Sequence, residues 1–439
     1  MKRQYGRHMK KMYRIKSLKC SVLCALVIVL CCACHNAAQI DQELDRTTES
    51  SDNSLSTEAS ENSVSDAGEQ NQSESDVPEE TEESVAETPK ILRTEVKVKG
   101  IYVTGPMAGS SGMEKLIDLV NTTELNTMVI DVKNDEGIIT YQMELPENMD
   151  IQATVSYVSD MPALVQRLHE QGIYVIARIC CYKDPRLAEA KPELALCLPN
   201  GKPVMDANNL AWVNPYKEEV WDYLCTLAEC AIRDGFDEVQ FDYVRFPIGN
   251  DARNADYGVD LEAYPREQCL TNFFQYTGER LHQQGILFGA DLFGTVIGSE
   301  ADRDSTGQNY GVLAGIADNL CPMIYPSHYA NGTFGLNVPD AKPYETIKGA
   351  MKRSDEELAL AKQSVVSGND ADVPVEQGVI RPWLQCFTAT WVEGHITYGS
   401  EQIQAQIQAV YDAGYDEFLL WNASNRYAQV PEALNNLKD

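Results

Sequence analysis

The sequence has little positive charge and few histidines. Its 439 residues include 36 lysines and arginines against 66 aspartates and glutamates, a net charge of −30 at pH 7. A nucleic-acid-binding protein needs a basic face to meet the phosphate backbone, so the composition excludes that class. Only six histidines are present, whereas a hydrolase built on a His/Asp metal cluster needs several at one site. The sequence therefore predicts no metal centre and no cofactor.

Two motifs that would indicate common alternatives are also missing. No CxxC pair occurs among the eight cysteines that follow residue 95, which argues against a zinc site or a disulfide framework. Most of these cysteines lie in apolar strand or helix contexts, where cysteine behaves as a small hydrophobe, so we expect free thiols. The glycine-rich segment 105–112 lacks the GxGxxG spacing of a doubly wound, dinucleotide-binding sheet.

Charge is distributed unevenly along the chain. Residues 1–40 contain eight lysines and arginines and no acid, and residues 41–90 contain sixteen acids against Arg46 and Lys90. These segments contribute +8 and −14 to the total of −30, so the remaining residues carry −24. A domain this acidic stays soluble and repels polyanions.

The first 34 residues resemble an export signal. A basic segment precedes an apolar run from Cys20 to Cys34, as in an n-region followed by an h-region. The end of this run, Leu30-Cys31-Cys32-Ala33-Cys34, resembles a bacterial lipoprotein cleavage site with Cys34 as the lipidated residue. Simple secretion and an uncleaved membrane anchor stay open as alternatives. We therefore expect an extracytoplasmic protein that is held at the membrane or secreted.

Residues 35–95 are predicted to be a disordered acidic linker. The stretch is rich in Ser, Glu, Thr, Asp and Asn and has almost no large apolar side chains. Such a composition buries too little apolar surface to offset its ordering entropy. The predicted domain organisation is a signal or anchor over residues 1–34, this linker, and one folded domain over residues 96–439.

The folded domain shows one repeated pattern. At Gly172, Gly235, Gly285 and Gly414 a helical segment ends on glycine and a strand follows at once, which is typical of βαβ units in a parallel sheet. The predicted strands are 100–104, 127–133, 173–179, 237–244, 286–292, 319–325, 379–387 and 416–421. Because eight strands close an α/β barrel, we predict a (β/α)₈ TIM barrel, with an elaborated active-site loop between about Ser327 and Gly378.

In such a barrel, side chains at the carboxyl ends of the strands meet in one pocket. The expected residues, in strand order, are Asp131, Lys133, Arg178, Asp242, Tyr243, Arg245, Asp291, Tyr325, His328, Gln385, Trp421 and Asn422. Aromatic faces stack on pyranose rings and polar groups satisfy sugar hydroxyls. This set therefore predicts a carbohydrate substrate.

Asp242 and Asp291 are the predicted catalytic pair. They end neighbouring strands at equivalent heights, and adjacent strands lie ~4.8 Å apart. Glycosidic cleavage needs one protonated acid to assist the leaving oxygen and one ionised carboxylate to attack the anomeric carbon or activate water. A purely structural alternative is that Asp242 pairs with Arg245 or caps a loop. Arg178 either holds a carboxylate ionised by proximity or forms a purely structural ion pair.

Several segments resemble the bacterial "putative glycosyl hydrolase domain" family, over about residues 99–427. They are 99–104 (KGIYVT), 129–135 (VIDVKND), 240–247 (QFDYVRFP) and 322–329 (PMIYPSHY). The resemblance implies a TIM-type barrel distantly similar to the alpha-amylase clan, with Asp242 matching the nucleophile and Asp291 the acid/base. Two positions depart from the clan's pattern: its strand-five acid is Glu rather than Asp291, and its third carboxylate has no counterpart near Gln385. Asp131 is the candidate replacement.

Two other functions stay open on the sequence. A carbohydrate-binding or wall-associated lipoprotein would keep the barrel without turnover. A metal-dependent polysaccharide deacetylase would need a His/Asp cluster, and only His328 is well placed for one. The acidic residues around Asp302 and Asp304 match no EF-hand spacing.

Overall fold

The computed structural model describes residues 96–366 and 377–437. The predicted signal, the lipidated Cys34 and the acidic linker lie outside these residues. Eight parallel barrel strands, here called staves, form the central sheet, and β9 with β10 counts as one stave. They are β1 (Lys99–Val103), β2 (Thr127–Lys133), β5 (Tyr174–Cys180), β6 (Glu238–Asp242), β7 (Phe288–Phe293), β8 (Asn319–Met323), β9 (Val379–Ile380) continued by β10 (Trp383–Gln385), and β11 (Phe418–Trp421). β1 pairs with both β2 and β11, so the sheet closes on itself. The predicted (β/α)₈ barrel is confirmed.

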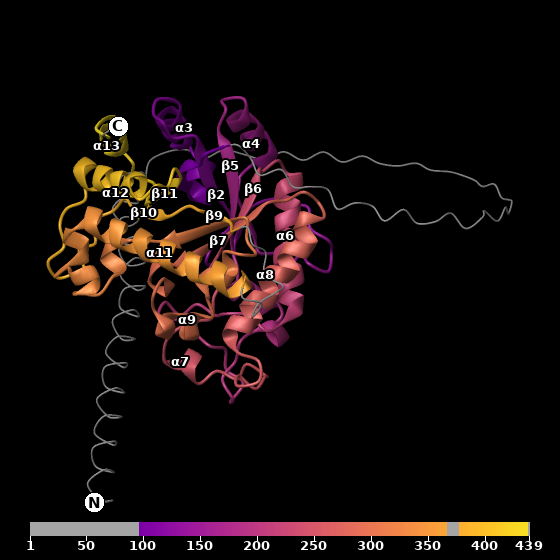
Figure 1. Cartoon of the computed structure of the whole chain (residues 1–439). Coiled ribbons are helices and arrows are strands. Elements are labelled where there is room, and N and C mark those ends of the chain that lie inside the picture. The colour runs from indigo at the N-terminus through magenta and orange to yellow at the C-terminus, as the bar shows by residue number, and fades with distance from the viewer. Residues whose placement is uncertain (1–95, 367–376, 438–439) are drawn as a thin grey trace, which may run out of the picture.

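Helices follow most of the staves and surround them. The longer ones are α3 (Met113–Asn121), α4 (Met161–His169), α6 (Glu218–Arg233), α8 (Arg266–His282), α11 (Pro343–Val366) and α12 (Ser400–Asp412). Figure 1 shows α6 and α8 on one side of the strands and α11 and α12 on the other. Shorter helices lie in the connections: α2 (Gly105–Ala108), α5 (Pro185–Ala190), α7 (Asn250–Arg253), α9 (Glu300–Thr306), α10 (Tyr310–Leu313) and α13 (Val430–Asn435).

The four helix-to-strand glycines have the conformation that the repeated pattern requires. Gly172, Gly235, Gly285 and Gly414 have φ angles of 73°, 110°, 73° and 85°. Glycine adopts this left-handed region without the Cβ clash that other residues meet. Each glycine therefore ends its helix and turns the chain directly into the next stave.

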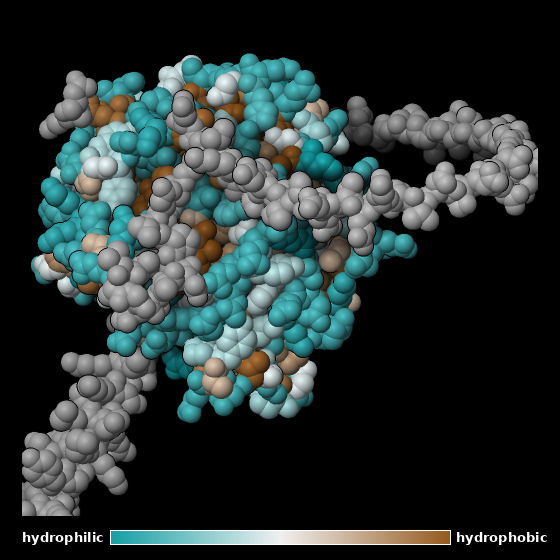
Figure 2. Space-filling model, turned by 45° about the vertical axis from the view of Figure 1, so that its right-hand side comes forward, coloured by the Kyte–Doolittle hydropathy of each residue, from teal (hydrophilic) through white to brown (hydrophobic). Residues whose placement is uncertain are grey.

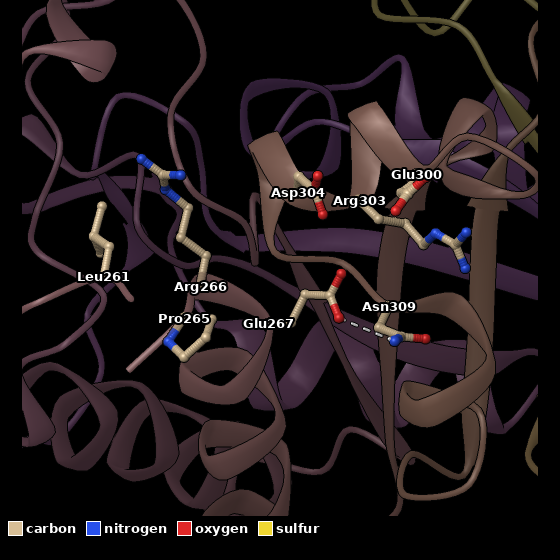
Figure 3. A pocket seen from close by; sticks show the side chains of 8 residues that line it. All are labelled: Leu261, Pro265, Arg266, Glu267, Glu300, Arg303, Asp304 and Asn309. Atoms are coloured by element: carbon tan, nitrogen blue, oxygen red, sulfur yellow. Dashed lines mark hydrogen bonds between the residues drawn. The ribbon is translucent and has the colours of Figure 1, made fainter. Parts of the chain in front are cut away.

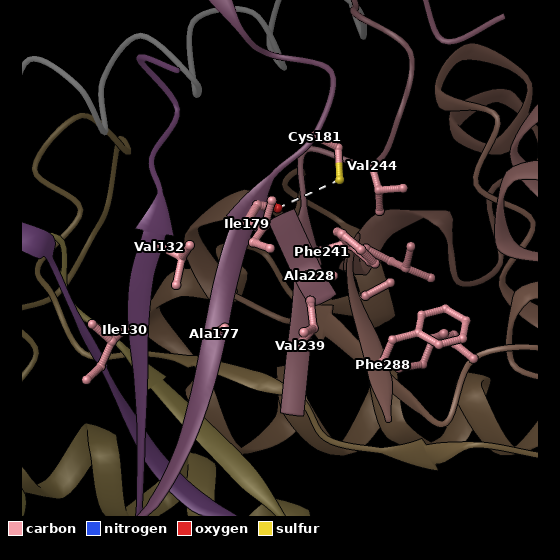
Figure 4. Close-up of a cluster of buried hydrophobic side chains, with 14 of the residues drawn as sticks. Ile130, Val132, Ala177, Ile179, Cys181, Ala228, Val239, Phe241, Val244 and Phe288 are labelled. Atoms are coloured by element: carbon pink, nitrogen blue, oxygen red, sulfur yellow. Dashed lines mark hydrogen bonds between the residues drawn. The ribbon is translucent and has the colours of Figure 1, made fainter. Parts of the chain in front are cut away.

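Alternation along the staves separates two environments. Outward side chains such as Ile130, Ile179 and Phe241 belong to the large apolar cluster between the strands and the surrounding helices, which also includes Ala228 of α6 (Figure 4). Inward side chains form a smaller apolar cluster that includes Val129, Ile176, Cys321, Trp383 and Leu419. The barrel is therefore a packed core rather than a channel, as TIM barrels generally are.

The amino-terminal end of the barrel, here called the floor, is filled by a buried ionic cluster. Arg381 donates through Nε to Glu417 and through Nη1 to Glu238, each at 2.8 Å. Asn319 accepts a further bond from Arg381 at 3.3 Å. The same end holds Lys99, the first residue of β1, because Lys99 pairs with Phe418 beside Glu417. The opposite end, here called the mouth, is therefore free to carry the functional site.

Several predicted boundaries are wrong, and two of them bear on the mouth. The fourth stave ends at Asp242 instead of Val244, because Tyr243 turns into the left-handed region at φ 49°. Most of the segment predicted as an elaborated loop after Ser327 is the regular helix α11, which packs against α12. The loop itself contains three short 3₁₀ turns, at 326–328, 333–335 and 339–341. Residues 367–376 lie outside the described part of the chain.

Two short strands extend the barrel beyond β2. β3 (Ile139–Tyr141) pairs antiparallel with β2, and β4 (Thr154–Val158) pairs with β3. All eight cysteines after residue 95 are free thiols, as expected, and seven of them are buried. Within the described ranges, no helix is both long and apolar enough to span a membrane.

Candidate active site

Asp242 and Asp291 lie level with each other at the mouth. The register of β6 and β7 pairs Phe241 with Ala290, so the next residue on each strand is one of the two aspartates. Both carboxyls belong to the inward-facing set, and their residues are 5% and 1% exposed. The predicted adjacency of the two acids is therefore present in the fold.

Arg178 on β5 links Asp242 to a third acid. Its Nε and Nη2 donate to one oxygen of Asp242 at 3.0 and 2.5 Å, and its Nη1 donates to Asp131 at 2.5 Å. The backbone N–H of Tyr243 donates to the other oxygen of Asp242 at 2.6 Å. Tyr102 of β1 donates to Asp131 at 2.6 Å. Asp242 thus pairs with Arg178 rather than with Arg245, and three donors stabilise its negative charge.

Asp291 has a different environment. Gln240 and the indole N–H of Trp383 both donate to its Oδ1, each at 2.6 Å. Burial, and next the negative charge of Asp242, raise the pKa of Asp291 well above its usual range, although Arg178 opposes the shift. A carboxyl that stays protonated in this way can donate a proton to a substrate oxygen.

Aromatic rings border these acids. Trp421 of β11, which is partly exposed, stacks on Tyr102 with ring centroids 4.0 Å apart. The Arg178 guanidinium lies 5.2 Å from each of these two rings. Tyr325 contacts Phe387 at 5.8 Å, and Phe387 stacks on Trp391 at 6.0 Å. These rings are of the kind that hold pyranose faces.

His328 lies in the turn after β8. Its ring contacts Tyr325 edge to face at 5.1 Å, and its Nδ1 lies 3.0 Å from the hydroxyl of Ser327. Burial lowers the pKa of His328 to about 4. The imidazole is therefore neutral at physiological pH, which suits hydrogen bonding rather than proton donation.

Tyr243 and Arg245 follow Asp242 in the turn that leaves β6. The Tyr243 ring has the ammonium of Lys183 at 4.8 Å and the guanidinium of Arg245 at 5.5 Å. A tyrosine at positive φ is strained by roughly 1–3 kcal/mol, and such strain is concentrated at functional positions. The turn thus holds an aromatic ring between two cations directly beside Asp242.

The structure does not bring three of the predicted substrate-binding residues to the acids. Lys133 is fully buried and bonds to Asp184 at 2.6 Å, because a bulge in β2 between Asp131 and Lys133 shifts the register. Gln385 is also fully buried and supports the loop after β8 through Ser327 and Asp340. Asn422 bonds to the carbonyls of Cys386 and Arg426. All three therefore act as supports of the surrounding loops.

No metal centre is found among the described residues, since no group of three His, Cys, Asp or Glu side chains there is arranged to hold an ion. A cavity of about 560 Å³ lies between the connections that follow β6 and β7 (Figure 3). It is lined by Leu261, Pro265, Arg266, Glu267, Glu300, Arg303, Asp304 and Asn309. None of the acids at the mouth lines it.

One protein-family model, described as "Putative glycosyl hydrolase domain", matches residues 100–427. The chain belongs to this family. The membership places the chain among the glycoside hydrolases, in agreement with the resemblance of its strand motifs. A search of curated protein sequences found no match.

The chain is similar to several solved structures. The glycoside hydrolase domain of PgaB (BpsB) from Bordetella bronchiseptica has a TM-score of 0.54 at 10% identity, covering 78% of this chain and 99% of that domain. A hypothetical protein from Ruminiclostridium thermocellum ATCC 27405 is 35% identical, covering 44% of this chain and 96% of its own, at a TM-score of 0.40. The spore cortex-lytic enzyme SleL from Bacillus cereus has a TM-score of 0.45 at 10% identity, covering 79% and 76%. The likeness to PgaB shows the common fold.

Within this glycosyl hydrolase barrel, sequence reasoning missed several partners of the acids. Gln240 shares the inward face of β6 with Asp242, and that alternation was the signal for its role. Tyr102 lies in one of the matching motifs but gave no sign of its bond to Asp131. Trp383 reads as a core residue, and only its indole N–H reveals its contact with Asp291. Phe387 and Trp391 both lie in the loop between β10 and α12, and the sequence does not predict the path of this loop.

Proposed function

We propose that the protein is an extracytoplasmic glycoside hydrolase that cleaves a polysaccharide or oligosaccharide with Asp242 and Asp291. The observation that carries this proposal is that two carboxyls at the same height on adjacent staves have opposite environments. Three donors stabilise the charge of Asp242, whereas burial favours the protonated form of Asp291. Pairs of acids in opposed environments are how glycosidases divide the two roles.

In this mechanism Asp291 donates its proton to the leaving glycosidic oxygen. Asp242 attacks or stabilises the developing positive charge at the anomeric carbon. Water then completes the cleavage, and ionised Asp291 takes a proton from it as the general base. Arg178 orients Asp242 and, through its bond to Asp131, ties three neighbouring staves together. Trp421, Tyr325 and His328 are proposed to contact the sugar rings and hydroxyls.

The test is to assay Asp242→Asn and Asp291→Asn on a panel of glycans and aryl glycosides. Removal of a general acid costs about 10²–10⁴ in rate on natural linkages. A dinitrophenyl leaving group needs no protonation, so Asp291→Asn should keep most of its first-step rate on that substrate, while Asp242→Asn should lose activity on both. Asp318→Asn is the matched control, because Asp318 pairs with His282 near the floor. Full activity of both mouth variants would remove the assignment.

A non-catalytic carbohydrate-binding role is the second candidate. The near-complete burial of Asp291 favours it, since a substrate must reach that carboxyl for catalysis. Binding of oligosaccharide in calorimetry with no new reducing ends from the wild-type protein would support this role.

A further inference from the structure

Among the described residues, one buried cation differs from the others. The buried lysines and arginines are Lys133, Arg178, Lys183, Arg245 and Arg381. Four of them bond to carboxylates: Lys133 to Asp184, Arg178 to Asp131 and Asp242, Lys183 to Asp135 and Asp206, and Arg381 to Glu238 and Glu417. Arg245 has no carboxylate partner in these ranges, although the protein carries 66 acids.

The surroundings of Arg245 are aromatic rather than acidic. Its guanidinium carbon lies 4.5 Å from the ring of Phe293, 4.8 Å from Trp212 and 5.5 Å from Tyr243. Its one hydrogen bond within the described residues runs from Nη1 to the carbonyl of Phe246 at 3.0 Å. Arg245 is 4% exposed. A buried cation without an anion is costly, because ring faces replace only part of its hydration.

An unsatisfied donor lies beside Arg245. The indole N–H of Trp212 is buried and has no hydrogen-bond partner among the described residues, and its ring is one of those that the Arg245 guanidinium contacts. Buried polar groups are nearly always paired, so each exception calls for an explanation. Both groups are donors, and a ligand that satisfied them would present acceptors.

Arg245 is fixed beside the catalytic pair. Gln308 donates to the carbonyls of Val244 and Asp291 at 3.2 and 3.4 Å, which ties the Arg245 turn to the strand that carries Asp291. Phe293, which contacts the guanidinium, ends that same strand. Arg245 also follows Asp242 by three residues. The unpaired cation therefore lies between the ends of the two staves that bear the acids.

We propose that Arg245 binds an anionic group on the sugar next to the bond that is cleaved, so the substrate is an acidic glycan. This inference rests on the proposed function. A carboxylate suits a guanidinium best, because the planar fork donates two parallel bonds to it. The net charge of −30 opposes acidic ligands only at long range, since salt screens exposed charges beyond about 8 Å under physiological conditions. A direct contact with Arg245 is not screened in this way.

The cavity of about 560 Å³ between the connections that follow β6 and β7 does not extend this site. Arg266 and Arg303 line it together with Glu267, Glu300 and Asp304, so acids outnumber bases there. The contact that distinguishes acidic from neutral sugars is therefore confined to one group of residues, here called the Arg245 cluster. It consists of Arg245, Trp212, Tyr243 and Phe293.

The experiment compares acidic oligosaccharides with their own neutral forms. Oligomers of galacturonate, alginate and hyaluronan are titrated into the full chain by calorimetry, each beside the same oligomer with its carboxyls reduced to alcohols and beside a sulfated neutral oligomer. Asp291→Asn serves as the background to prevent turnover. We expect at least one acidic oligomer to bind about 10- to 100-fold tighter than its reduced form, as expected for charged hydrogen bonds.

Variants connect this preference to the residue. Arg245→Gln should abolish the preference for acidic over reduced oligomers, and Arg245→Lys should keep part of it. Arg353→Gln is the control and should leave the preference unchanged. Arg353 also contacts a ring, that of Phe334, but it lies on α11. An Arg245-dependent preference for the sulfated oligomer would support the site with sulfate as its ligand. Equal binding of acidic and neutral forms, or an unchanged preference in folded Arg245→Gln, would overturn the proposal. If the wild-type protein prefers acidic oligomers but cleaves none of them, the proposed hydrolase activity is wrong and the anion site at Arg245 is still supported.

Discussion

Asp291 is buried against Gln240 and Trp383, and its protonation connects the active site to the stability of the fold. Burial raises the pKa of Asp291 well above its usual range. Its favourable contribution is therefore complete below the unfolded pKa of about 3.9 and is lost as the pH rises through the folded value. Asp291→Asn cannot ionise, so it should gain stability relative to wild type as the pH rises from 4 to 7, by up to about 1.4 kcal/mol per pH unit.

Urea denaturation at several pH values measures this difference. A constant offset between the two proteins across that range would show that Asp291 ionises as easily in the folded state as in the unfolded chain. The sequence located this aspartate by its position at the end of a predicted strand, but it did not predict the pKa. That shift depends on Gln240, Trp383 and the closed barrel around them, which are contacts between residues far apart in the chain.

At the scale of elements, the ionic cluster at the floor should govern stability without affecting turnover. Arg381→Met would leave Glu238 and Glu417 buried without their cation. Removing one partner from a buried ion pair costs about 3–5 kcal/mol. We expect this loss in urea denaturation at pH 7. The loss should be smaller at pH 4.5, because burial raises the pKa of Glu238 and its stranded carboxyl takes up a proton. Activity of the folded variant should stay close to wild type.

Arg280→Met is the control for that measurement. Arg280 pairs with Glu229 and Asp222, but its side chain is 25% exposed, so its loss should cost about 1 kcal/mol or less. Similar losses for the two variants would contradict a special role of the floor cluster.

The order of elements was predictable, whereas their ends were less so. Glycines at the helix ends and apolar runs at regular spacing specify eight βα units from local signals alone. The end of β6 at Asp242 was not predictable, because a tyrosine at positive φ is held there by contacts with Lys183, Arg245 and Trp212. Likewise the bulge in β2 that shifts the register and turns Lys133 toward Asp184 has no signal in the motif itself.

For the whole molecule, attachment through Cys34 remains a prediction that fractionation can test. In cells that process lipoproteins, the full chain should partition with membranes and incorporate labelled palmitate. Cys34→Ala should be released or stay unprocessed without label, and Cys32→Ala should behave as wild type. Equal labelling of the Cys34 and Cys32 variants would contradict lipidation at Cys34.

The surface of the folded part carries few large apolar side chains. Figure 2 shows a mostly hydrophilic face with small, separate apolar areas. Large exposed apolar side chains are few among the described residues, and only Leu360 is more than half exposed.

The position of Lys99 at the floor has a consequence for orientation. The chain enters the barrel at the end opposite to Asp242 and Asp291. A tether through the first residues, as predicted from the sequence, would therefore join the folded part at the end away from the two carboxyls. A long polymer could then approach those carboxyls from a side of the barrel that carries no attachment point.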